Sequence, residues 1–131
     1  PWQGRRYLDG GVADSIPYEA VGRLGYDRRV VILTRDLEYR KKPMPWAAVR
    51  AMYGKYPVFC QRLLNRHTVY NASVARLAAL EKAGEIFVLR PSQPITVRRL
   101  ERDPAALQAV YDLGIKDARA HLFALKDYLS K

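Results

Sequence analysis

Three short segments that end at charged or turn residues predict β-strands, and they lie at residues 5–8, 29–34 and 86–89. The middle segment is a continuous apolar run rich in β-branched residues, which is typical of a strand buried on both faces. A helix predicted over residues 18–24, between the first two strands, would complete a parallel βαβ unit with a right-handed crossover. The pattern therefore predicts the α/β fold class.

Apolar residues at spacings of three and four predict helices in the rest of the chain. Two short helices are expected over residues 46–53 and 58–65, and a longer one over residues 70–80 that ends before Gly84. Asp103 and Pro104 predict the start of a helix that Gly114 ends. A last helix should present one packing face, formed by Ile115, Ala118, Leu122, Leu125 and Leu129. Residues 36–45 form an expected exposed loop.

The 131 residues include a single cysteine, Cys60, and carry a formal charge of +10. One cysteine excludes an internal disulfide and a cysteine-based zinc site. The positive charge favours polyanions, either nucleic acid or an anionic membrane surface. No apolar run reaches the roughly 18 residues that a membrane span needs. A first residue other than Met, with no signal segment, predicts a piece of a longer protein, located in the cytoplasm or peripherally at the membrane.

The clearest candidate chemistry is the carboxylate of Asp9, which is followed by Gly10 and Gly11. A carboxylate at the carboxyl end of a parallel strand points into the crevice where α/β proteins place their sites. There it could accept a serine proton directly, as a general base. The alternative is an ordinary tight turn, because Asp-Gly-Gly is also a common turn sequence.

Residues 7–17, Tyr-Leu-Asp-Gly-Gly-Val-Ala-Asp-Ser-Ile-Pro, resemble the aspartate motif of patatin-like acyl hydrolases. The resemblance continues through residues 65–71, 84–91, 100–104 and 111–114, so it covers essentially the whole chain and is closest to bacterial patatin-like phospholipases. It implies hydrolysis of lipid esters by a Ser-Asp dyad, without metal or cofactor. In that reading Asp9 is the dyad aspartate, and Gly10 and Gly11 form the turn that brings it to the serine.

The resemblance also implies a fold and a division of the chain. Residues 1–131 would be the C-terminal part of a three-layer α/β/α domain, with a few short parallel strands and a helical C-terminal extension. Residues 1–35 would end the catalytic domain, and residues 36–131 would be mainly helical with one strand near 85–90. No Gly-x-Ser-x-Gly element occurs in the sequence. The piece alone is therefore expected to be inactive, with a lipid ester or phospholipid as the substrate of its parent.

The other candidate site residues give weaker indications of function. Cys60 and His67 could share a helical face, and His67 and His121 lack carboxylates at metal-ligand spacing. Asp14 is expected to cap the following helix, and Asn71 either caps a helix or makes a buried polar contact. Basic clusters at residues 40–42 and 98–99 would face solvent or anionic lipid. Nucleic acid is not expected as a partner of the acyl hydrolase. The alternative function is a basic helical module that binds nucleic acid or a protein. The sequence leaves the oligomeric state open.

Overall fold

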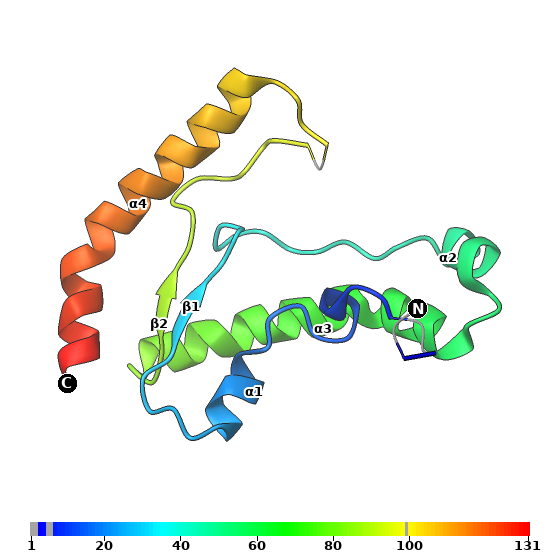
Figure 1. Ribbon diagram of the computed structural model, residues 1–131, viewed down its shortest axis with the longest axis horizontal. Coiled ribbons are helices and arrows are strands. Elements are labelled where there is room, and N and C mark those ends of the chain that lie inside the picture. Colours follow the sequence, from blue (N-terminus) through cyan, green and yellow to red (C-terminus); the bar gives the residue numbers. More distant parts are fainter. Residues whose placement is uncertain (1–2, 5–6, 99) are drawn as a thin grey trace.

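The computed structural model describes residues 3–4, 7–98 and 100–131, and it is mainly helical with one small sheet (Figure 1). The elements in chain order are the 3-10 helix η1 (Gly10–Val12), α1 (Tyr18–Arg23), β1 (Val30–Ile32), α2 (Trp46–Tyr53), α3 (Pro57–Lys82), β2 (Phe87–Leu89) and α4 (Pro104–Ser130). The strand expected at residues 5–8 is not found where it can be tested, because Tyr7 and Leu8 lie outside any strand. The first two residues of that segment lie outside the described residues.

The sheet consists of β1 and β2, which pair in parallel with Val31 opposite Val88. At one end the Phe87 N–H donates to the Arg29 carbonyl at 2.9 Å, and at the other the Leu33 N–H donates to the Leu89 carbonyl at 2.8 Å. The parallel pairing confirms the α/β class in its general form. The partner of β1 was expected to be the segment at residues 5–8, and that was wrong: β1 pairs with β2 across a connection that contains α2 and α3.

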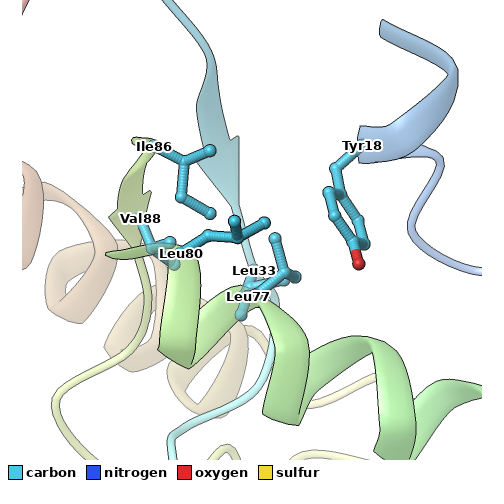
Figure 2. Close-up of a cluster of buried hydrophobic side chains, with 6 residues drawn as sticks. All are labelled: Tyr18, Leu33, Leu77, Leu80, Ile86 and Val88. Atoms are coloured by element: carbon cyan, nitrogen blue, oxygen red, sulfur yellow. The ribbon is translucent and has the colours of Figure 1, made fainter. Parts of the chain in front are cut away.

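The main core lies between one face of this sheet and α3 (Figure 2). Leu77 and Leu80 of α3 meet Leu33 after β1, and Tyr18 of α1 closes the side of the cluster. Val88 of β2 and Ile86, which precedes this strand, complete the cluster. A smaller core joins α2 to α3, where Val49 and Leu63 are buried and the rings of Tyr53 and Phe59 meet edge to face at 5.0 Å.

The other face of the sheet is covered by α4, but only over β2. The Phe87 ring lies 5.7 Å from the Tyr128 ring, and the Arg29 N–H donates to the Tyr128 hydroxyl at 3.1 Å. Val30 and Ile32 of β1 stay exposed, Ile32 by 73%. The expectation that β1 is buried on both faces is therefore wrong, because no described element covers these two side chains.

Both long helices run through positions where breaks were expected. α3 is continuous from Pro57 to Lys82, and α4 passes through Gly114. One glycine costs a helix only about 1 kcal/mol, and cooperative extension on both sides outweighs that cost. The start of α4 is as predicted, since the Asp103 carboxylate accepts a hydrogen bond from the Ala105 N–H at 3.0 Å. Gly84, with a φ of 75°, follows the end of α3.

The apolar face predicted for the last helix is largely uncovered. Leu122 and Leu129 are 47% and 52% exposed, and Ile115 is also exposed. This happens because β2 is the main neighbour of α4, whose N-terminal end projects away from the rest of the molecule (Figure 1). Among the described residues no helix has both the length and the apolarity that crossing a bilayer requires.

Candidate functional site

Asp9 lies at the start of η1, with an exposed side chain. One carboxylate oxygen, Oδ1, accepts a hydrogen bond from the Gly11 N–H at 2.8 Å, so Asp9 caps this short helix. The other oxygen, Oδ2, makes no hydrogen bond to the described residues. The carboxylate is thus oriented through one oxygen while the second remains available.

Gly11 leaves room for this arrangement, whereas the absence of a side chain at Gly10 has no such effect. A Cβ on Gly11 would lie 3.2 Å from Asp9 Oδ1, which is tighter than ordinary packing, while a Cβ on Gly10 would meet open space. Neither glycine is among the described residues with a positive φ. The pair therefore forms a helical turn of ordinary handedness, and the tight glycine turn suggested by the sequence is not of the left-handed kind.

Two hydrogen bonds fix this turn to the rest of the fold. The Gly11 carbonyl accepts from Ser15 Oγ at 2.7 Å and from Arg66 Nε at 2.9 Å. Arg66 belongs to α3, 55 residues further along the chain, so the bond joins the Asp-Gly-Gly turn to the longest neighbouring helix. No local sequence pattern signals such a contact.

Asp9 borders an open cleft of about 570 Å³ between this turn and the beginning of α3. Most of the side chains that line the cleft are apolar, namely Leu8, Val12, Ala13, Pro57, Val58 and Phe59. Lys55 and Arg62 provide positive charge on the α3 side. A carboxylate next to an apolar cleft with cations near its rim suits a substrate with a long apolar part and a polar or anionic head.

The remaining candidates have structural roles. The Asp14 carboxylate accepts from the Ile16 N–H at 3.1 Å, ahead of α1, so its expected role as the helix N-cap is wrong: Pro17 holds that position. Cys60 donates to the Tyr53 carbonyl, and His67 Nδ1 lies 2.8 Å from the Leu64 carbonyl, so each has its own backbone partner. Within the described ranges no three His, Cys, Asp or Glu side chains gather closely enough to hold a metal ion.

Asn71 makes the polar contact that was one of its two expected roles. Its Oδ1 accepts from the Lys41 N–H at 2.9 Å, and its Nδ2 donates to the Lys41 carbonyl at 3.1 Å. The side chain thereby clamps the basic loop at residues 36–45 to α3. Sequence reasoning identified Asn71 as polar and placed it on a helix, but not its partner.

The match to a known protein family falls on the mainly helical region of the chain. No curated protein matches the chain, and no solved structure does. A family model described as a domain of unknown function, DUF6363, matches residues 56–130, which include α3, β2 and α4 but neither Asp9 nor its turn. Since the match covers more than half of the 131 residues, the chain belongs to the DUF6363 family.

Proposed function

We propose that this chain is the C-terminal part of a patatin-like lipid acyl hydrolase and supplies Asp9 as the carboxylate of a Ser-Asp dyad. The observation that carries the proposal is the position of Asp9, exposed and capped through Oδ1, at the border of an apolar cleft of about 570 Å³. The serine would come from the rest of the parent protein. The 131-residue chain alone has no nucleophile elbow and is inactive.

The chemistry follows from the two oxygens of Asp9. The Gly11 N–H holds Oδ1 at 2.8 Å, so Oδ2 is directed to accept the hydroxyl proton of the incoming serine. As the serine oxygen bonds to the ester carbonyl carbon, that proton moves to Oδ2 and then to the departing alcohol, leaving an acyl-serine. Water, deprotonated by the same carboxylate, then releases the fatty acid and restores the serine. No cofactor or metal is needed for these steps.

The sheet supports the proposal through its open edge. In a parallel ladder alternate residues bond to the same neighbour. Arg29 and Leu33 bond to β2, so Val30 and Ile32 direct their backbone groups to the opposite edge. Further strands of a larger α/β/α domain could pair with this open edge.

The substrate class follows from the cleft and the charge. The apolar lining suits an acyl chain, and the charge of +10 favours a phospholipid or the anionic surface of a membrane. The corresponding location is peripheral at that surface or in the cytoplasm. Nucleic acid is not proposed as a partner.

The rival function is a basic helical binding module for nucleic acid or another protein. The observation that favours it is the family match, which begins at residue 56 and leaves out the Asp-Gly-Gly turn. In that case residues 56–130 would bind a partner without catalysing a reaction, and Asp9 would only cap a helical turn.

Asp9→Asn in the longer parent protein separates the two functions. Asparagine keeps an oxygen for the Gly11 N–H, so the turn should persist, but it cannot serve as a base. Turnover on a phospholipid should fall about 100- to 10,000-fold with a nearly unchanged melting temperature. Asp14→Asn is the matched control, because that carboxylate also accepts a backbone hydrogen bond and has no proposed chemistry. Near-normal turnover in Asp9→Asn would show that Asp9 is not the dyad base, which would leave this chain the role of a binding module.

A further inference from the structure

A second cavity, of about 380 Å³, lies between the loop at residues 36–45 and α3. Its lining includes Tyr39, Lys41, Lys42, Met44, Arg66 and His67. No carboxylate is among the residues that line it. The cavity is therefore positively charged, and two of its cations are held in fixed positions by other parts of the fold.

Lys41 is fixed at both its backbone and its side chain. Asn71 of α3 bonds the Lys41 N–H and carbonyl at 2.9 and 3.1 Å. The ammonium nitrogen lies 4.7 Å from the centre of the Tyr70 ring, a cation–π contact that directs the side chain across α3. A lysine that merely faced solvent would have neither restraint.

Arg66 is fixed through one nitrogen and leaves the others available. Its Nε donates to the Gly11 carbonyl at 2.9 Å and lies 3.4 Å from Ser15 Oγ. Its two terminal amino groups make no hydrogen bond to the described residues, which leaves up to four N–H donors. Arg66 and Tyr70 are one helical turn apart on α3, so Arg66 and the Lys41 ammonium beside Tyr70 lie toward the same face of this helix, and both residues line the cavity.

Neither Lys41 nor Arg66 forms an ion pair within the part of the chain that the structure describes. The ion pairs found there, Arg90 with Glu81 and Lys131 with Asp127, lie elsewhere. Asp36 is on the same loop, where its carboxylate accepts from the Glu38 N–H. Burial, followed by the charges of Arg66 and Arg35, lowers the pKa of Lys41, so its charged form is less favoured than that of an exposed lysine.

We propose that this cavity binds a phosphate group through the Lys41 ammonium and the terminal amino groups of Arg66. A phosphate offers several acceptor oxygens and up to two negative charges, which match a point cation and a guanidinium that approach from different elements. The inference rests on the proposed function, because a phospholipid held here by its phosphate would lie beside the Asp9 turn. Arg66 is the link, since it also bonds the Gly11 carbonyl.

The first test titrates the 131-residue chain with inorganic phosphate and follows the backbone amide signals of Lys41 and Asn71 by NMR. We expect saturable shifts and an affinity about tenfold lower in Lys41→Gln, as for the loss of one charge-assisted hydrogen bond. Lys41→Arg should retain binding, which separates lost charge from a disturbed fold. Lys126→Gln is the control, because Lys126 is exposed on α4 and away from the cavity, and its affinity should stay within about twofold. Absent saturation, or equal losses in both glutamine variants, would overturn the proposal.

The second test distinguishes a lipid headgroup from free phosphate. Vesicles of phosphatidylglycerol in phosphatidylcholine should bind the chain and be displaced by inorganic phosphate. Their affinity should fall more with Lys41→Gln than with Lys126→Gln. Equal weakening by both variants, with phosphate binding intact, would overturn the headgroup assignment and leave a site for soluble phosphate. Asp9→Asn should leave phosphate affinity unchanged, so the dyad and the phosphate site can fail independently.

Discussion

The clamp between Asn71 and Lys41 predicts where the fold opens first when it is removed. Asn71→Ala deletes two hydrogen bonds that join residues 30 positions apart. Each such bond contributes about 0.5 to 1.5 kcal/mol net, so the loop should lose about 1 to 3 kcal/mol of docking free energy. A change of that size corresponds to about 5- to 150-fold in the equilibrium between docked and open loop.

Native-state hydrogen exchange measures this opening directly, because the Lys41 N–H is the donor of one deleted bond. Its exchange should accelerate by about that factor, while the amides of the Leu77 region of α3 should keep their protection. Asn65→Ala is the matched control, since Asn65 is an exposed asparagine on the same helix with no hydrogen bond from its side chain to the described residues. Unchanged exchange at Lys41 in Asn71→Ala, or equal acceleration in Asn65→Ala, would refute the clamp.

Two further predictions concern stability. Leu77→Ala should lower the free energy of unfolding, measured in urea, by about 2 to 5 kcal/mol, because Leu77 is 1% exposed in the main core. The control is Leu107→Ala, at a position that is 47% exposed, which should lower it by less than about 1 kcal/mol. A similar cost for both would contradict the assigned core. Asp117→Ala should cost about 1.5 kcal/mol near neutral pH, since the Asp117 carboxylate accepts from the Ser92 N–H at 2.8 Å. That hydrogen bond lowers the pKa of Asp117 below its ordinary 3.8. The wild type should therefore keep its full extra free energy of unfolding over Asp117→Ala above pH 3.8, and lose it as acid protonates the folded carboxylate. A difference in free energy of unfolding that does not vary with pH would exclude this role.

The sequence predicted the elements whose signals are local. The strands around Val31 and Val88 follow from short runs of branched apolar residues, and the start of α4 follows from Asp103 and Pro104. The glycine after α3, Gly84, has the positive φ that this position favours. Each of these features depends on a few neighbouring residues, so tertiary contacts did not alter it.

The predictions from the sequence were wrong about where one helix ends and which strands pair. Gly114 suggested a helix end, but its cost of about 1 kcal/mol is small beside the cooperative extension of α4 on both sides. The strand partner of β1 was assigned to the nearest candidate along the chain, and the structure pairs it with β2 instead. The clamp at Asn71 and the bond from Arg66 to Gly11 join residues 30 and 55 positions apart, and no periodicity encodes either contact.

The exposed side chains of β1 bear directly on the proposed function. An apolar, β-branched run is the composition of a strand with neighbours on both sides, yet Ile32 is 73% exposed and the outer edge of β1 has no partner among the described residues. Helix α4 shows the same mismatch, since Leu122 and Leu129 lie on a face that its composition suits for packing. Surfaces that are apolar and uncovered favour association with further protein. In a larger α/β/α domain, further strands could pair with this edge of β1 and extend the sheet. The open edge of β1 is therefore the place where the larger domain of the dyad proposal would pair with this chain.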